Sequence, residues 1–378
     1  MRILALCEQT GISGGTESYL RTLRDALLAR EHEMRVVTRA DLQWSDEHDP
    51  PSRDAAARLR ALCTAFRPDA IALHSIFDAE IIRAARESAR NLTYHLHDHR
   101  LFCPNGNRVY PQGGGRCRVR MGHACAVHAL AHGCVYGPRP RTLQLISRRE
   151  EAARAAFTSD RIVVFSEFMA ATARNNNAPA GKVAHIAPAI DAAFFRPQTE
   201  PHSAVPAILF SGRVEPAKGL HSLIHAIASI AVERRPAIVV AGDGPDLPHC
   251  VELAHKLGCE LQTLGLLDRA GVIAAIDRAN IVAMPSLWDE PFGLSGIEAL
   301  ARGRPVAAYN VGAIGEWIGD GGIVERAGDT RALGRAIEAI LQPRRWARYA
   351  VAAAKQAQRY RLDQHVDAIV QCYETSAR

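Results

Sequence analysis

The chain has 378 residues, of which 48% are hydrophobic and 23% are charged. This length exceeds one typical hydrophobic core, so we expect two domains, and the ordinary composition excludes a disordered or fibrous protein. The formal net charge of +6 is modest for this length. It allows an anionic ligand or a membrane surface, but it does not single out nucleic acid, and we expect no nucleic-acid partner.

The first apolar run, residues 3–6, is short, and a carboxylate follows it at Glu8. This pattern is typical of a buried strand and not of a secretory signal. Nowhere does the sequence contain an apolar stretch long enough to span a bilayer. We therefore expect a cytoplasmic protein, whose nine cysteines are reduced.

Short apolar runs alternate with amphipathic stretches along the whole chain. The predicted strands are residues 3–6, 35–38, 70–74, 92–96, 161–165, 207–210, 237–241, 260–264, 280–284 and 305–308. Helical patterns lie between them, among others at residues 17–30, 54–66, 220–232 and 269–278. Several strands are continuously apolar, as parallel strands covered on both faces are. The alternation predicts the α/β class with doubly wound parallel sheets.

The alternation is interrupted at residues 193–202, where prolines and polar residues indicate a linker. We place the boundary at about residue 197, which gives domains of residues 1–197 and 198–358, and residues 359–378 are predicted to form a helical tail. Residues 100–139 are predicted to be a long irregular insertion in the first domain. Loops of that length are usually functional or mobile.

Two segments of the first domain are candidate ligand sites. Gly14 and Gly15 stand between the first strand and the first helix, where the backbone can approach an anion. A plain tight turn is the alternative, and the spacing is not that of a dinucleotide fingerprint. His95, His97 and His99 alternate at a strand end, where they could bind a sugar, a phosphate or a metal, or simply be polar.

A loop of the second domain carries two cations, Arg213 and Lys218, among glycines. It joins a strand to a helix. A planar guanidinium and a compact ammonium there can neutralise a diphosphate leaving group without a metal. Two solvated surface cations are the alternative, but the position between strand and helix favours phosphate binding.

Residues 285–300 carry two glutamates around a predicted helix start. The amides of Phe292, Gly293 and Leu294 would point outward there and could bond phosphate oxygens. Glu290 could accept hydrogen bonds from sugar hydroxyls, and Glu298 from a ribose diol. A helix N-terminal acid and a solvated helix position are the alternatives for these two residues.

Glu290 and Glu298, with seven residues between them, match the E-x(7)-E motif of retaining glycosyltransferases. The surrounding sequence EPFGLSGIEALARGRPV resembles glycosyltransferase family 4, the glycosyl transferases group 1 domain. The segments FSGRVEPAKG, VAGDGP and GGTE support the resemblance, which covers nearly the whole chain and is strongest over residues 207–312.

The resemblance implies a GT-B fold, in which two Rossmann-like domains face a central cleft. The second domain would bind an NDP-sugar donor (UDP or GDP), the first a glycan or lipid-linked acceptor, and the last helix would return to the first domain. Arg213 and Lys218 would hold the diphosphate, while Glu290 would contact the donor sugar. By position, the carboxylate of Glu298 would hold the ribose of the donor. The helix-start residues Phe292, Gly293 and Leu294 and the backbone of Gly15 would lie against the diphosphate, and the catalytic His97 would lie beside the sugar.

The resemblance also implies that the anomeric configuration is kept and that Glu290 stabilises positive charge without forming a covalent adduct. No cofactor or metal is expected for catalysis. We expect a hexosyltransferase-type enzyme of bacterial polysaccharide or glycoconjugate synthesis. The alternatives are a GT-B sugar-nucleotide epimerase and a non-catalytic sugar-nucleotide-binding protein.

Two features of the first domain stand outside this assignment. Cys103, Cys117, Cys125 and Cys134 lack the CxxC pairs of a typical zinc site, so a structural zinc, free thiols and a flexible acceptor loop stay open. Residues 139–154 form a predicted basic amphipathic helix, which would either lie peripherally on anionic lipid at the inner face of the membrane or be a solvated helix.

Overall fold

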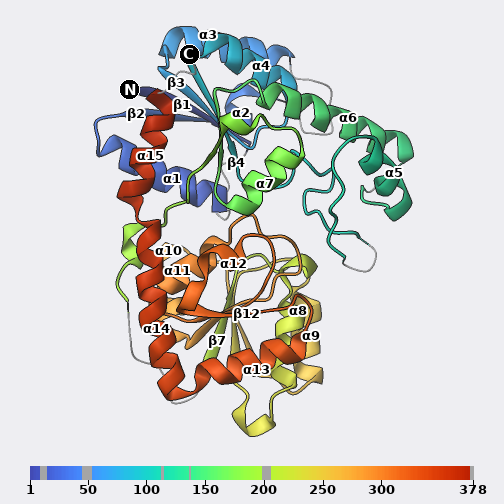
Figure 1. The fold of residues 1–378 in the computed structure, drawn as a ribbon, viewed down its shortest axis with the longest axis vertical. Helices are drawn as coiled ribbons and strands as arrows, with labels where there is room; N and C mark the ends of the chain where they lie inside the picture. Colours follow the sequence, from blue (N-terminus) through green and yellow to red (C-terminus); the bar gives the residue numbers. More distant parts are fainter. Residues whose placement is uncertain (9–14, 45–52, 112–114, 136–137, 198–205, 375–378) are drawn as a thin grey trace. The chain divides into compact units, whose positions relative to one another are not determined.

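The computed structural model describes residues 1–8, 15–44, 53–111, 115–135, 138–197 and 206–374 (Figure 1). The chain divides into two compact units, Met1–Ala189 with Leu362–Arg378, and Ile190–Arg361. The sequence-based boundary near residue 197 therefore lies inside the second unit. Contacts between distant parts of the sequence tie this segment to the second unit: the backbone N–H of Ile190 donates to the carbonyl of Tyr360 at 3.2 Å, and the guanidinium of Arg361 lies over the Phe195 ring.

The first unit is built on a six-stranded parallel sheet of order β2-β1-β3-β4-β5-β6. Its strands are β1 (Arg2–Cys7), β2 (Glu33–Thr38), β3 (Ala70–His74), β4 (Asn91–Leu96), β5 (Arg161–Val164) and β6 (Val183–His185). Five of these were predicted. β6 was missed because it has three residues and is only half-buried, so it gives no apolar run.

Helices cover both faces of this sheet. They are α1 (Gly15–Leu28), α2 (Arg39–Leu42), α3 (Arg53–Phe66), α4 (Ala79–Ser88), α5 (His123–His132), α6 (Arg139–Ala156), α7 (Glu167–Asn175) and α15 (Leu362–Glu374). The C-terminal α15 packs against α1 and β4, whereas α3, α4 and α6 pack in succession elsewhere on the unit (Figure 1). The predicted tail helix therefore lies on the sheet of the first unit.

The second unit has the parallel order β12-β11-β10-β7-β8-β9. Its strands are β7 (Ala207–Ser211), β8 (Ala237–Ala241), β9 (Leu261–Gly265), β10 (Ile281–Met284), β11 (Val306–Tyr309) and β12 (Gly322–Glu325). The missed strand, β12, is half-buried and lies at the sheet edge. Together the two sheets confirm the predicted α/β class with doubly wound parallel sheets.

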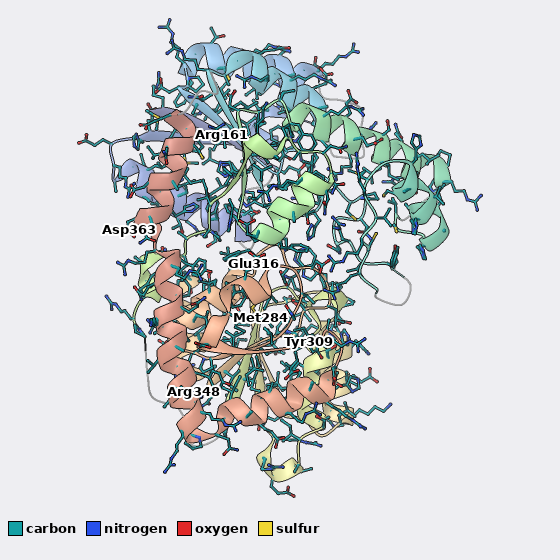
Figure 2. All side chains as sticks on the ribbon, viewed as in Figure 1. Arg161, Met284, Tyr309, Glu316, Arg348 and Asp363 are labelled. Atoms are coloured by element: carbon teal, nitrogen blue, oxygen red, sulfur yellow. The ribbon has the colours of Figure 1, made fainter. Side chains whose placement is uncertain are left out.

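The helices of the second unit are α8 (Leu220–Ala228), α9 (Leu247–Lys256), α10 (Arg269–Arg278), α11 (Leu294–Ala301), α12 (Ile314–Trp317), α13 (Thr330–Leu341) and α14 (Pro343–Ala357). Side chains fill the space between helices and sheet, and Met284 and Tyr309 mark the ends of two central strands (Figure 2). The chain runs from β7 outward to β8 and β9 and then returns to β10 on the other side. Ligands of such sheets bind where the strand order reverses, beyond the carboxyl ends of the strands. In this unit that place is between the loops after β7 and β10.

The insertion of the first unit is more regular than predicted. It contains α5 and an isolated antiparallel bridge between Val109 and Arg116. A small apolar cluster of Cys125, Ala129 and Ile146 joins α5 to α6. The prediction of an irregular segment was therefore wrong for residues 123–132, where the high histidine and cysteine content obscured the helical pattern.

The predicted basic helix is α6, but its arginines do not share one exposed face. Arg149 is buried, and its guanidinium lies 4.3 Å from the centroid of the Phe77 ring. Leu145 and Ile146 are buried as well, so only part of the predicted surface is available. Within the described ranges, every helix is too short or too polar to cross a membrane.

Candidate active site

The loops after β7 and β10 are joined through their backbones. The N–H of Leu287 donates to the carbonyl of Ala217 at 2.8 Å. Gly219 adopts φ +73°, and a Cβ there would lie 2.0 Å from the carbonyl oxygen of Pro285. Only glycine fits this close approach, so the glycine predicted to border the cationic loop has a structural reason.

Glu290 is the buried centre of this junction. Its Oε1 accepts hydrogen bonds from Lys218 Nζ at 2.8 Å, from Ser286 Oγ at 2.6 Å and from Trp288 Nε1 at 2.9 Å. The ammonium of Lys218 also lies 4.8 Å from the centroid of the Trp288 ring. Burial alone would raise the pKa of Glu290, but the charge of Lys218 and the hydrogen bonds outweigh it and lower the pKa. The carboxylate is therefore anionic at neutral pH.

The backbone of Glu290 is fixed from the loop after β11. Its carbonyl accepts the N–H of Ala313 at 2.9 Å. Gly312 has φ +54°, and a Cβ there would lie 2.1 Å from the Glu290 carbonyl oxygen. A third strand end thus holds the carboxylate in place, which preorganises a charge before any ligand binds.

Arg213 lies in the same loop as Lys218 but has a different environment. Its side chain is 69% exposed, and its guanidinium donates to Glu215 at 3.1 Å. The loop itself is anchored, because the N–H of Val214 donates to the carbonyl of Asp243 at 2.8 Å. The structure thus brings Lys218 and Glu290 into contact and presents the Arg213 guanidinium to solvent, where an exposed ion pair contributes little and can exchange for an anionic ligand.

Helix α11 begins at Leu294, at the place where the sequence predicts backbone donors for phosphate. Gly293 precedes the helix with φ +97°, and no side chain caps the helix start at Leu294. Such uncapped amides are suited to phosphate oxygens. Phe292 has a packing role: its ring lies 5.6 Å from that of Tyr360, and its carbonyl accepts Trp317 Nε1 at 2.6 Å.

Glu298 lies one turn into α11 and is half-buried, not solvated. Burial, with a smaller contribution from the charge of Asp191, raises its pKa from 4.5 to about 7. The folded protein therefore binds this proton more tightly than the unfolded chain. The protonated Glu298 side chain therefore contributes fully to the free energy of unfolding below pH 4.5, and this contribution is lost as the pH rises through 7.

We expect Glu298→Gln to stabilise the free protein at pH 8 by about 1–3 kcal/mol, because the desolvated charge is removed. Most of this gain should be absent at pH 5. Urea unfolding at the two pH values measures it, with the exposed Glu233→Gln as the control. An equal gain at both values would show that the effect does not come from this carboxyl group.

His97 follows β4 in the first unit and belongs to a buried histidine group. Its Nε2 lies 2.9 Å from His74 Nδ1, and the rings of His74 and His95 stack with centroids 4.2 Å apart. Burial lowers the pKa of His97 to about 4. The ring is therefore neutral at physiological pH, which suits a hydrogen bond to a sugar hydroxyl better than proton donation.

The predicted face of three alternating histidines is only partly formed. His95 and His97 lie on it, but His99 is buried against the Phe168 ring, and His74 takes the third place. The ligand atoms of His74, His95 and His97 lie within 4.8 Å of one another. The hydrogen bond between His74 Nδ1 and His97 Nε2 already uses one ring nitrogen of each, so this group resembles a packed layer of neutral side chains more than a metal site.

Gly15 is the exposed first residue of α1, and Gly14 and the rest of its loop, residues 9–14, lie outside the described residues.

The four cysteines of the insertion are free thiols. Cys125 interacts electrostatically with the other three, and backbone amides at 105, 106 and 108 donate to Cys103 Sγ. A structural zinc at these thiols stays one of the open alternatives.

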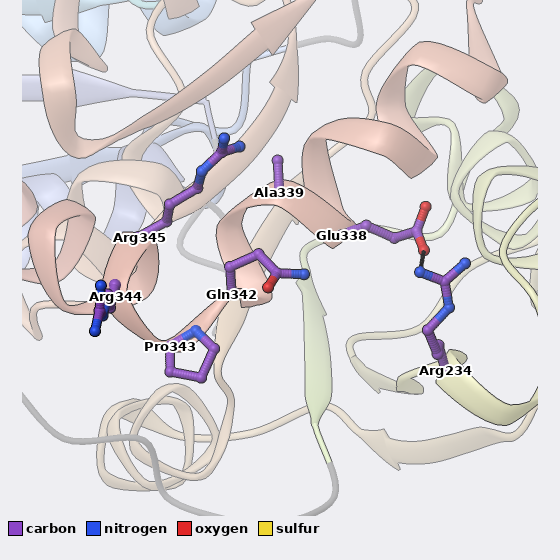
Figure 3. A pocket seen from close by; sticks show the side chains of 7 residues that line it. All are labelled: Arg234, Glu338, Ala339, Gln342, Pro343, Arg344 and Arg345. Atoms are coloured by element: carbon purple, nitrogen blue, oxygen red, sulfur yellow. Dashed lines mark ion pairs between the residues drawn. The ribbon is translucent and has the colours of Figure 1, made fainter.

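A surface hollow of about 710 Å³ lies elsewhere in the second unit, where α13 meets α14 (Figure 3). An ion pair of 3.0 Å between Arg234 and Glu338 spans part of it. None of the predicted site residues lines this hollow. The convergence of groups after β7, β10 and β11 is the better candidate site.

Comparison with known families places these features in context. The family Glycosyltransferase Family 4 matches residues 13–194, and the family Glycosyl transferases group 1 matches residues 191–358. The chain belongs to the family 4 glycosyltransferases. It is therefore a glycosyltransferase, and the predicted resemblance is confirmed.

Relatives of this glycosyltransferase act on different acceptors. It is 27% identical over 405 residues to the D-inositol 3-phosphate glycosyltransferase of Rhodococcus erythropolis, with 97% of this chain and 88% of the relative covered. It is 33% identical over 177 residues to the phosphatidyl-myo-inositol mannosyltransferase of Mycobacterium leprae, with 45% and 46% covered.

Solved structures confirm the GT-B fold. HepE of Anabaena in complex with UDP-glucose superposes with a TM-score of 0.72 at 20% identity and covers 98% of both chains. The sucrose-phosphate synthase of Thermosynechococcus elongatus gives a TM-score of 0.75 at 18% identity, also with 98% of both chains covered.

Three partners of the predicted residues, two in the second unit and one in the first, were not found from the sequence. Ser286 and Trp288 bond the Glu290 carboxylate, and His74 pairs with His97. Ser286 and Trp288 lie within the segment that was singled out, but nothing in their spacing indicates which way they point. His74 could have been found from strand register, because it lies opposite His95 at the end of β3.

Proposed function

We propose that this glycosyltransferase moves a sugar from a nucleoside diphosphate sugar to a glycan or lipid-linked acceptor with retention of configuration. The observation that carries the proposal is the buried contact between Lys218 and Glu290, 2.8 Å long, at the point where the strand order reverses. A cation and an anion held there can act on the two halves of a breaking glycosidic bond. The complex of HepE with UDP-glucose supports a nucleotide-sugar donor.

The proposed chemistry assigns each charge to one side of the bond that breaks. As the diphosphate leaves, negative charge grows on its oxygens, and Arg213, Lys218 and the first amides of α11 stabilise it. Positive charge grows on the sugar near its anomeric carbon, and the Glu290 carboxylate stabilises that. Such fixed charges act strongly in a buried site, because little solvent has to reorganise.

Retention follows if the acceptor attacks from the face that the diphosphate leaves. The leaving diphosphate would then take the acceptor proton, so no separate protein base is required. Because the His97 ring is neutral at physiological pH, it suits a hydrogen bond to the sugar and does not suit donation of a proton as a general acid. The roles predicted for His97 and Gly15 beside the donor stay predictions, as do an acceptor of polysaccharide synthesis and a place at the inner face of the membrane.

The experiment is a panel of nucleoside diphosphates in a thermal-shift assay, followed by a donor assay. A ligand of the native state raises the melting temperature, so the preferred base is expected to stand out, with UDP and GDP as the first two candidates. Release of nucleotide from the matching donor should rise at least tenfold with an acceptor. Nucleotide release that is the same with and without acceptor, together with formation of epimerised sugar, would favour a sugar-nucleotide epimerase. Donor binding without nucleotide release would favour a non-catalytic protein.

We expect Arg213→Ala to weaken nucleoside diphosphate binding about 10-fold to 100-fold, since a charge-assisted pair of bonds is lost. Stability should hardly change, because the side chain is exposed. Isothermal titration with the preferred diphosphate measures the affinity. Arg234→Ala, which removes another exposed ion-paired arginine of the same unit, is the matched control. Equal affinities of Arg213→Ala and the control would contradict the assignment.

A further inference from the structure

A second group of chemically active side chains lies at the start of α9. Asp246, His249 and Cys250 have the spacing i, i+3, i+4, which puts them on one face of the helix. Their ligand atoms lie within 4.8 Å of one another. His221 approaches the same carboxylate from α8, which packs against α9.

The distances in this group suit a metal ion. His249 Nδ1 is 3.3 Å from Asp246 Oδ1, and Cys250 Sγ is 3.5 Å from Asp246 Oδ2. Tetrahedral zinc with bonds of about 2.0–2.3 Å separates neighbouring nitrogen, oxygen and sulfur ligands by about 3.3–3.6 Å. His221 Nδ1 is 3.8 Å from Asp246 Oδ2 and lies beside this group of three, so it would have to turn toward the ion to become a fourth ligand.

The types of donor also agree with one class of ion. Imidazole nitrogen and thiolate sulfur with one carboxylate select zinc and similar transition metals over magnesium or calcium. Cys250 is fully buried and its thiol faces the Asp246 carboxylate. A divalent ion bound there would have a thiolate and a carboxylate as ligands, and its charge would balance both anions.

The alternative is a carboxylate that only accepts hydrogen bonds from two imidazoles and a thiol. It explains the contacts but gives no reason for a carboxylate, an imidazole and a thiol to lie within 4.8 Å of one another with a second imidazole beside the carboxylate. We propose that Asp246, His249 and Cys250, with His221 as the fourth ligand, bind a divalent transition metal of the zinc type.

This site is linked to the loop that carries Arg213. The N–H of Asp246 donates to the carbonyl of Val214 at 3.2 Å. A Cβ at Gly244 would lie 2.2 Å from the same carbonyl oxygen, so the two loops are in close contact. An ion bound at Asp246 would therefore fix the backbone against which the cationic loop packs. The evidence for the metal site is its own geometry, which does not depend on the proposed transfer reaction.

The test is a titration of the reduced, metal-free full chain with Co²⁺, whose thiolate charge-transfer and visible bands report tetrahedral sulfur ligation. Zinc is then added to displace the cobalt. We expect His249→Ala and Cys250→Ser to bind one equivalent less than the wild type and to lose the corresponding bands. His249 is 66% exposed, so its removal leaves the fold intact and keeps the test decisive if Cys250→Ser folds poorly.

Two controls separate this site from other ligands. His255→Ala removes another exposed histidine of α9 and should bind like the wild type. Cys125→Ser changes the cysteines of the insertion and should leave the bands of the α9 site in place. Equal stoichiometry in the wild type, His249→Ala and Cys250→Ser would overturn the proposal, as would a wild-type chain that binds no cobalt.

Discussion

Glu290→Gln is expected to lower the rate of sugar transfer about 100-fold to 1,000-fold, the range seen when one preorganised electrostatic contact is removed from an active site. Glutamine keeps the shape and one oxygen to accept from Lys218, Ser286 and Trp288, but it removes the negative charge that faces the developing positive charge. Because that charge exists mainly in the transition state, kcat should fall while donor affinity stays within a few-fold.

Initial rates at saturating donor, together with a calorimetric donor titration, measure both quantities. The control is Glu233→Gln, which removes an exposed carboxylate of the same unit and should leave the rate unchanged. A variant at Glu290 that turns over within threefold of the wild type would remove this residue from the chemistry. A loss of donor binding as large as the loss of rate would instead indicate a ground-state role.

Lys218→Met should destabilise the protein by about 3 kcal/mol at pH 8, because it leaves the 4% exposed Glu290 side chain without its cation. The pKa of Glu290 would then rise, since burial is no longer opposed by a positive charge. The folded protein would hold that proton above pH 4.5. The loss of stability should therefore be present at pH 8 and be smaller at pH 5.

The double variant Lys218→Met with Glu290→Gln separates the pair from its surroundings. Removing both charges should recover most of the lost stability, because no unpaired charge remains buried. Urea unfolding of the four proteins of this cycle gives the coupling energy. If the double variant were no more stable than Lys218→Met, the ion pair would not be the cause.

Much of the fold follows from local patterns. Several of the ten predicted strands were found because buried parallel strands are continuously apolar. The edge strands β6 and β12 were missed because their residues are half-buried and carry no such pattern. The structure divides the chain before Ile190, whose N–H donates to the carbonyl of Tyr360. This contact joins segments 170 residues apart in the sequence, and no local pattern reveals it.

The site was predictable where it depends on spacing and not where it depends on side-chain direction. Strand-to-helix loops at neighbouring parallel strands must meet, so Lys218 and Glu290 could be expected in one place. Their 2.8 Å contact, and the bonds from Ser286 and Trp288, depend on loop conformation. The burial of Arg149 in α6 and the raised pKa of Glu298 likewise depend on packing that the sequence does not display.

A crystal structure with an intact nucleotide-sugar bound is the most direct measurement. We predict diphosphate oxygens in contact with Arg213 and Lys218, and the anomeric carbon of the sugar next to the Glu290 carboxylate. A donor bound away from the junction of the β7 and β10 loops, or a sugar that does not face Glu290, would contradict the proposed mechanism.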